Sequence, residues 1–197
     1  MSNDTKDRIL EAALEIFSRD GYAGANLKDI AEAVGVVKSG FYRHYASKEE
    51  LWNAVLDEME RYYAERFGSS DNMPAIPQST DELKTLTLRM LDFTMHDKKI
   101  IMTRKILLTE QFRDARVRGL ATKHFGAGLE ALFTKLFAGM MENGSMKRGD
   151  PAMLAFAYTA PISTLVQLCD REPEQYEAVM KKIKDYIDHF AAAYGEK

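Results

Sequence analysis

Apolar residues recur three and four positions apart along almost the whole chain, which is the spacing of one face of an α-helix. The first such stripe consists of Ile9, Leu10, Ala13, Leu14 and Phe17. Alternating runs rich in Val, Ile and Thr, which would indicate strands joined by tight hairpins, are absent. The sequence therefore predicts an all-α fold of about nine helices with no sheet.

Capping residues and loop composition indicate where the chain divides. A capping box at Ser47 and Glu50 predicts the start of a long helix at Lys48. Residues 68–79 then form the only loop rich in Gly, Ser and Pro, so we expect a domain boundary there. The expected parts are a domain of residues 1–47, a connecting helix of residues 48–67 and a second domain of residues 68–197.

The composition predicts a cytoplasmic protein that is not inserted in a membrane. Of the 197 residues, 46% are hydrophobic and 29% are charged, a balance typical of a globular protein. No apolar run approaches the roughly 20 residues of a membrane span, and the polar start MSNDTKDR does not resemble a signal peptide. A lone Cys169 rules out a disulfide framework within the chain.

Residues 27–34 predict a short helix that ends at Gly35, which can adopt the left-handed backbone conformation without a Cβ penalty. A second short helix is expected over residues 38–45. The two helices and the turn between them form a helix-turn-helix, in which we expect Val36 and Phe41 to point inward.

The outward side of this second helix is polar and basic. Residues from Val36 to Lys48 include three Lys and Arg and no acid, whereas residues 1–67 as a whole contain 9 basic and 13 acidic residues. Positive charge is therefore focused on one short protruding helix. This pattern is typical of a protein that binds duplex DNA.

The segments RIL, AAL, IF, DGY, IAEAVGV, FYRHY and SKEEL follow one another within residues 8–56. In this order they resemble the N-terminal domain of TetR-type (TetR/AcrR) bacterial transcriptional regulators. The resemblance implies a three-helix DNA-binding domain, joined by a long helix to an all-helical core that binds a small ligand and forms a homodimer. The candidate DNA-binding residues, from the resemblance and from the outward face together, are Lys28, Lys38, Ser39, Gly40, Tyr42, Arg43, His44 and Lys48.

The same resemblance suggests which part of the DNA these residues contact. Tyr42 and Lys48 would contact phosphates, and Lys38 with Ser39 would approach base edges. The two residues after Tyr42 could equally belong to a solvated basic face, and both interpretations stay open.

Two positions of the second helix depart from the family pattern. Family members commonly have Ser or Thr at the position of Val37, where the hydroxyl caps the helix, and the loss of such a cap costs about 1 kcal/mol. Gly40 inside the helix costs roughly another 1 kcal/mol relative to Ala. We therefore expect this helix to fray when it is not bound to DNA.

Several Met and Phe residues of the second domain could be plain core or the wall of a ligand pocket. The candidate pocket residues are Met90, Phe93, Met102, Phe125, Phe133 and Phe156. Residues 98–123 contain eight Lys and Arg against two acids. This run could be a solvated face or a site for an anionic effector.

The last two helices, expected over residues 151–171 and 174–194, have more apolar surface than one subunit would cover. The resemblance places a two-fold interface between subunits here. The candidate interface residues are Leu154, Tyr158, Leu165, Val179, Ile183, Tyr186, Ile187 and Phe190.

The sequence contains no phosphate-binding glycine loop, no nucleophile elbow and no zinc-type spacing of His and Cys. We therefore expect neither an enzyme nor a protein with a metal or cofactor. The predicted function is that of a ligand-responsive regulator, a repressor, which binds a palindromic DNA operator as a homodimer and is released by an unknown small molecule. The alternative is an interaction protein of the same fold, with weakened DNA reading, that binds a partner protein.

Overall fold

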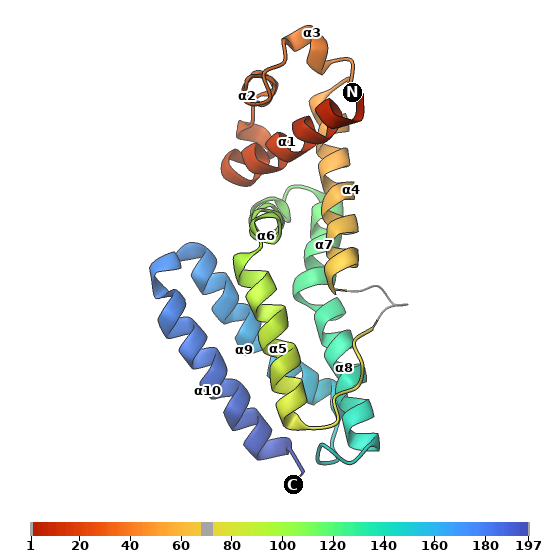
Figure 1. Cartoon of the computed structure of the whole chain (residues 1–197), viewed down its shortest axis with the longest axis vertical. Helices are drawn as coiled ribbons and strands as arrows, with labels where there is room; N and C mark the ends of the chain where they lie inside the picture. Colours follow the sequence, from red (N-terminus) through yellow and green to blue (C-terminus); the bar gives the residue numbers. More distant parts are fainter. Residues whose placement is uncertain (1, 68–72, 197) are drawn as a thin grey trace. The chain divides into compact units, whose positions relative to one another are not determined.

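The computed structural model describes residues 2–67 and 73–196, without the side chains of Ser2, Asn3 and Lys38. Part of the loop expected over residues 68–79 therefore lies outside the described residues. Within them the fold is all-α, as predicted, with ten α-helices and one short 3-10 helix (Figure 1). The elements are α1 (Ser2–Gly24), α2 (Leu27–Ala33), α3 (Lys38–Phe41), α4 (Lys48–Phe67), α5 (Thr80–His96), α6 (Lys98–Glu110), α7 (Ala115–Phe125), α8 (Ala127–Glu142), α9 (Pro151–Arg171), η1 (Pro173–Gln175) and α10 (Tyr176–Tyr194).

The chain forms two compact units, which we call unit 1 and unit 2. Unit 1 comprises residues 1–68 and 98–120, and unit 2 comprises residues 69–97 and 121–197. The first break falls beside the boundary expected after residue 67. However, residues 98–120, which were expected in the second domain, belong to the same unit as the helix-turn-helix. The division by function stays a prediction.

Unit 1 is built around α1, which packs against α2, α4 and α6 (Figure 1). The predicted apolar stripe of α1 is buried at Ile9 and Phe17, and Leu56 and Ile106 are buried from α4 and α6. The buried side of α4 is broad. It consists of Leu51, Trp52, Val55, Leu56, Met59 and Tyr63.

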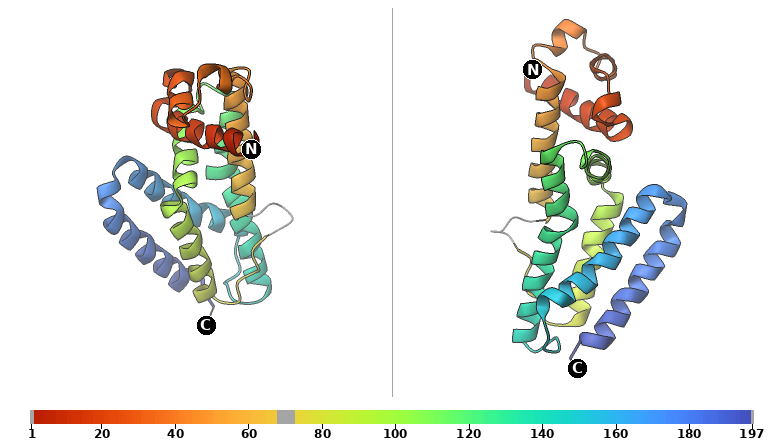
Figure 2. Two further views of the ribbon diagram at one scale, coloured as in Figure 1. Left: turned by 45° about the horizontal axis from the view of Figure 1, so that its top comes forward. Right: turned by 180° about the vertical axis from the view of Figure 1, so that it is seen from behind.

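Unit 2 has an aromatic core formed by α5, α8, α9 and α10. Helix α8 packs along α9, and α10 runs back antiparallel to α9 (Figure 2). The ring of Tyr158 lies 5.2 Å from Phe133, 5.5 Å from Phe137 and 4.6 Å from Phe190, measured between ring centroids. Its hydroxyl forms a 2.8 Å hydrogen bond with that of Thr87. Burial raises the pKa of Tyr158, so this hydroxyl stays neutral inside the core.

Candidate nucleic-acid interface

The turn of the helix-turn-helix is fixed by backbone geometry and by a tether from α1. The side chain of Asn26 caps α2 by accepting a hydrogen bond from the N–H of Lys28 at 2.9 Å. After α2, Gly35 has a φ of 71°, in the left-handed region that favours glycine. The guanidinium of Arg8 donates to the carbonyl of Val34 at 2.8 Å. The turn at Gly35 therefore has the predicted conformation, whereas the Arg8 tether was not anticipated.

Helix α3 is shorter than the helix expected over residues 38–45. It is one turn, Lys38–Phe41, and begins with hydrogen bonds from the N–H groups of Gly40 and Phe41 to the carbonyl of Val37. Beyond Phe41 the chain continues as a turn, in which the N–H of His44 donates to the carbonyl of Phe41 at 2.9 Å. The valine at the cap and the glycine inside the helix give a physical reason for this early end.

Most of the described outward residues of this segment are exposed. Phe41 is buried, whereas Ser39 and Arg43 are exposed and Tyr42 is 44% exposed. His44 is half-buried. The side chain of Lys38 lies outside the described part of the structure. Polar and basic side chains are thus available on the outside of α3 and of the turn after it.

Two of the expected DNA-binding residues, Lys48 and Lys28, have partners within the protein. The ammonium of Lys48 lies 4.7 Å from the ring centroid of Tyr22 and donates to the carbonyl of Ala23 at 3.5 Å. Lys28 forms an exposed ion pair with Glu32 at 3.5 Å. These contacts give both lysines a structural role in the free protein. Their assignment to DNA binding stays a prediction.

Several basic residues from the run at 98–123 pair with acids of α1 and α4 inside unit 1. The pairs are Lys98 with Glu15 at 3.3 Å, Lys99 with Glu58, and Arg116 with Asp57. Burial opposes ionisation of Glu58, but hydrogen bonds from Lys99 and Arg61 outweigh it and hold the pKa of Glu58 below its ordinary value. The run therefore balances the acids of the N-terminal segment, which favours a structural interpretation over an anionic-effector site.

A buried carboxylate at the end of α6 contacts the kink in α1, where the backbone of Gly21 is not helical. Glu110 is 4% exposed, and its Oε1 accepts a hydrogen bond from the N–H of Tyr22 at 3.1 Å. The preceding Gly21 has a φ of 70°, and a Cβ there would lie 2.6 Å from this oxygen. Glu110 was not among the residues predicted from the sequence. Glu110 lies three residues after Leu107 and seven after Thr103, so it shares the buried stripe of α6. This helical spacing could have indicated that Glu110 is buried.

A second carboxylate, Asp114, links the start of α7 to the only tryptophan. Its side chain accepts hydrogen bonds from the N–H groups of Arg116 at 2.8 Å and Val117 at 3.1 Å, and from Nε1 of Trp52 at 2.9 Å. The ring of Trp52 lies 5.0 Å from that of Phe17. Burial opposes ionisation of Asp114, but the three hydrogen bonds outweigh it and lower its pKa. No short-range pattern indicated this pairing.

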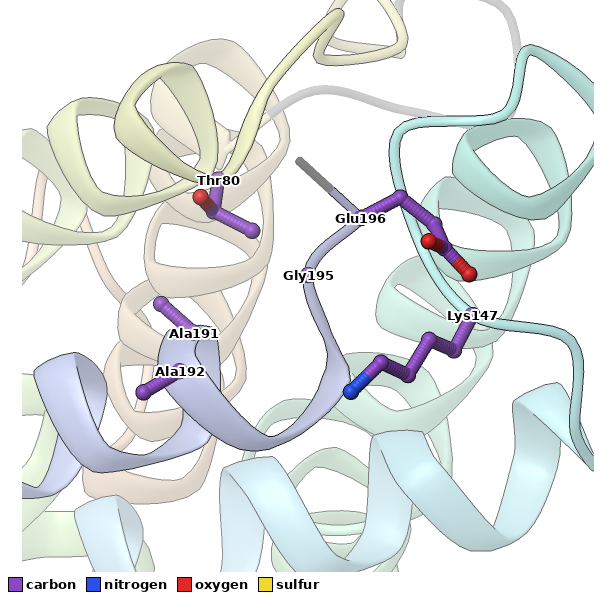
Figure 3. A pocket seen from close by; sticks show the side chains of 6 residues that line it. All are labelled: Thr80, Lys147, Ala191, Ala192, Gly195 and Glu196. Carbon is purple, nitrogen blue, oxygen red and sulfur yellow. The ribbon is translucent and has the colours of Figure 1, made fainter.

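The candidate ligand-pocket residues are spread over both units. Met102 is in unit 1, Phe133 is buried in the aromatic core of unit 2, and Phe156 is 55% exposed on α9. One hollow of about 630 Å³ lies elsewhere in unit 2, where the start of α5 approaches the end of α10 (Figure 3). Its lining consists of Thr80, Lys147, Ala191, Ala192, Gly195 and Glu196. None of the candidate pocket residues lines this hollow, so their role stays a prediction.

Most of the candidate interface residues lie inside unit 2. Tyr158, Val179, Ile183, Ile187 and Phe190 are buried within one chain, so they leave almost no surface for a second subunit. They face inward because they form the helical stripes that pack α9 and α10 onto the core. Leu154, Leu165 and Tyr186 are half-buried.

The exposed apolar face of α9 lies on its other side. Met153 is 62% exposed and Phe156 is 55% exposed, and Ala157 lies next to them. By length and composition alone, α9 could cross a membrane. This corrects the expectation that no such segment exists. Helices in the cores of proteins have the same length and composition. Helix α9 is such a core helix, because its Ala155, Tyr158 and Ile162 are buried in unit 2.

Comparisons with known proteins identify the N-terminal segment. Residues 9–55 match the family described as "Bacterial regulatory proteins, tetR family". The chain is similar to the biofilm operon icaADBC HTH-type negative transcriptional regulator IcaR of Staphylococcus epidermidis, with 36% identity over 58 residues, which are 29% of this chain and 31% of that protein. It is also similar to the HTH-type transcriptional regulator TtgR of Pseudomonas putida, with 33% identity over 85 residues, which are 43% of this chain and 37% of that protein. The matched segment spans about a third of the length of these relatives, and their names describe regulators rather than enzymes.

Solved structures extend the likeness of fold to the whole chain. The SmeT–triclosan complex has a TM-score of 0.71 at 18% identity, over 98% of this chain and 93% of that chain. A TetR family transcriptional regulator from Pseudomonas syringae has a TM-score of 0.67 at 18% identity, over 100% of both chains.

The fixed turn, the outward face of α3 and the all-α fold define a helix-turn-helix protein. Residues 9–55 match the tetR family of bacterial regulatory proteins, and the fold of the whole chain is like that of solved TetR-family structures, in agreement with the resemblance.

Proposed function

We propose that this protein regulates transcription in the bacterial cytoplasm by binding a palindromic DNA operator as a homodimer. The observation that carries the proposal is the turn at Gly35, which fixes an exposed face containing Ser39, Tyr42 and Arg43 within the segment that matches the family. Repression is supported by what is known of two similar proteins from their names. IcaR is a negative regulator, and SmeT is the repressor of the Stenotrophomonas maltophilia multidrug efflux pump SmeDEF.

Dimer formation is supported by the exposed apolar face of α9. Met153 and Phe156 are large side chains that would be costly to leave in water, and they lie one helical turn apart. A two-fold contact between copies would cover the same residues on both chains. The subunit interface is therefore proposed on this face, with Leu154 and Leu165 at its edge, rather than on the residues buried in the core.

Release from DNA by a small molecule is supported by the SmeT–triclosan complex, which contains a small molecule in a protein of similar fold. The half-sites of an operator lie about 34 Å apart, one helical turn of DNA. A ligand in unit 2 that binds better to one arrangement of the dimer would change the spacing of the two α3 helices. Binding to both half-sites would then be lost.

The test is selection of bound sequences from a random duplex pool with the full-length protein. We expect enrichment of a palindrome whose half-sites are about one turn apart, and an affinity that falls linearly with the logarithm of salt concentration. Arg43→Ala should weaken binding of the selected duplex. Lack of any enriched sequence, together with binding that does not respond to salt, would refute the proposal.

A second function, binding of a partner protein, is favoured by one observation. Helix α3 is a single turn, and Val37 at its start is 72% exposed. An apolar, weakly helical tip would suit a protein contact if DNA reading were lost. The same selection separates the two functions, because an interaction protein would enrich no duplex sequence.

A further inference from the structure

Val37 is an exposed apolar residue at the start of α3, the second helix of the helix-turn-helix. Its side chain is 72% exposed, although the residues around it on the outside of the motif are polar or basic. Its carbonyl accepts hydrogen bonds from the N–H groups of Gly40 at 2.8 Å and Phe41 at 3.1 Å. Val37 is therefore held by the backbone at the N-cap of α3, and it is not part of a mobile loop.

The surroundings of Val37 leave its methyl groups accessible. A Cβ placed on Gly40 would lie 3.8 Å from Cγ2 of Val37, so the glycine lies next to the valine and covers little of it. Since a β-branched side chain has few χ1 rotamers, the two methyl groups are also limited in where they can point. The result is a small, stiff apolar surface beside the exposed Ser39.

We propose that Val37 contacts the C5-methyl group of a thymine in the major groove, an inference that rests on the proposed DNA binding. Through this contact Val37 determines specificity at one base pair of each half-site. Residues at the N-terminus of a recognition helix are those that reach base edges. Thymine is the base that presents a methyl group in the major groove. Valine has no hydrogen-bonding group, so it would leave the polar edges of the other bases unpaired.

A single valine is a poor centre for a protein–protein contact. Such contacts concentrate their binding energy in large aromatic or Arg side chains that are fully desolvated at the middle of an apolar patch. Val37 is instead followed by Ser39 and Arg43, which are exposed and polar. The thymine contact requires only a small apolar surface, and this is what Val37 provides.

The experiment replaces thymine by uracil, one position at a time, in the duplex selected by the full-length protein. Uracil keeps every hydrogen-bonding group of thymine and lacks only the methyl group. We expect one position in each half-site at which uracil weakens binding of the wild-type protein by about four-fold, the factor expected for burial of one methyl group. Val37→Ala should bind the thymine duplex more weakly and should bind thymine and uracil duplexes equally.

Two controls assign the effect. Ser39→Ala should bind more weakly but should keep the uracil penalty, because its change lies outside the methyl contact. The thermal unfolding of Val37→Ala should match that of the wild type, since Val37 is exposed. If wild-type binding is unaffected by uracil at every position, or if Val37→Ala keeps the penalty, the assignment of Val37 is overturned while DNA binding stands. If no duplex is enriched at all, both the proposed function and this contact are overturned.

Discussion

Gly21 and Gly40 both lie in helical segments of unit 1, but a side chain would have opposite effects at the two positions. Gly21 has a φ of 70°, and a Cβ there would lie 2.6 Å from Glu110 Oε1. Gly40 has no left-handed φ, and a Cβ there would make ordinary contact with Val37 at 3.8 Å. Gly21 is therefore required by the structure, whereas Gly40 only weakens the short helix that contains it.

Gly40→Ala is expected to stabilise the protein. The gain should approach about 1 kcal/mol, the difference in helix propensity between glycine and alanine, and urea unfolding without DNA would measure it. Gly35→Ala is the matched control and should destabilise by about 1–2 kcal/mol, because its φ is 71°. A loss of stability in Gly40→Ala would contradict the prediction.

Glu110→Ala is expected to destabilise the protein by about 1–3 kcal/mol, because it leaves the N–H of Tyr22 without its acceptor in a buried site. Glu110→Gln retains an acceptor oxygen of the same reach and should lose less. Urea unfolding followed by circular dichroism measures both. Equal losses in the two variants would show that the hydrogen bond is not the cause.

At the scale of single elements, the start of α7 depends on one side chain that also binds a residue of α4. Asp114 caps α7 through two N–H groups and accepts the indole N–H of Trp52. The lowered pKa of Asp114 means that its ionised form is favoured by folding. Its contribution is therefore complete above the unfolded pKa of about 3.9 and is lost as the pH falls through the lower folded value.

Asp114→Asn isolates this charge, because asparagine caps helices about as well as aspartate. The free-energy advantage of the wild type over Asp114→Asn should be constant from about pH 5 to 7 and should shrink below about pH 4. Asp114→Ala, which also removes the cap, should lose about 0.5–2 kcal/mol more at neutral pH. Denaturant unfolding at several pH values checks both. An advantage that grows in acid would contradict the pKa argument.

Sequence patterns predicted the local features of the motif and missed the long-range ones. The turn at Gly35 and the inward position of Phe41 depend on neighbouring residues, so spacing and residue type were sufficient. The length of α3 was overestimated, although the two residues that shorten it had been recognised. Glu110 and Asp114 pair with backbone and side-chain groups 88 and 62 positions away. No periodicity within a helix specifies such partners.

At the scale of the whole molecule, the apolar surface of α9 had two possible uses, and the sequence could not separate them. Tyr158 and Phe156 are both aromatic residues of one helix, yet Tyr158 is buried and Phe156 is 55% exposed. A helix that is apolar nearly all round does not indicate which side faces its own core. Only the packing of α8 and α10 decides this. The ligand pocket was equally beyond a sequence pattern, because Met and Phe serve both cores and pocket walls.

Phe156→Glu is expected to dissociate the proposed homodimer, because it places a charge in the apolar contact face. Light scattering at micromolar concentration should show a dimer for the wild type and a 22.4 kDa monomer for the variant. Phe112→Glu is the control, since Phe112 is 82% exposed but lies in unit 1, and it should remain dimeric. A monomeric wild type, or dissociation by both variants, would refute the assignment of the interface to α9.

Unit 1 is made of two separate stretches of chain, and this limits how the protein can be divided. Residues 98–120 carry seven Lys and Arg against two acids, whereas residues 1–67 carry nine against thirteen. A chimera joined to a relative at residue 67 would keep the helix-turn-helix. It would lose the basic residues of 98–120 that balance the acids of residues 1–67, and it would also lose Glu110 and Asp114. The transplanted segment would be net negative and would repel the duplex that it has to approach. Exchange of DNA specificity between relatives therefore has to carry both stretches together.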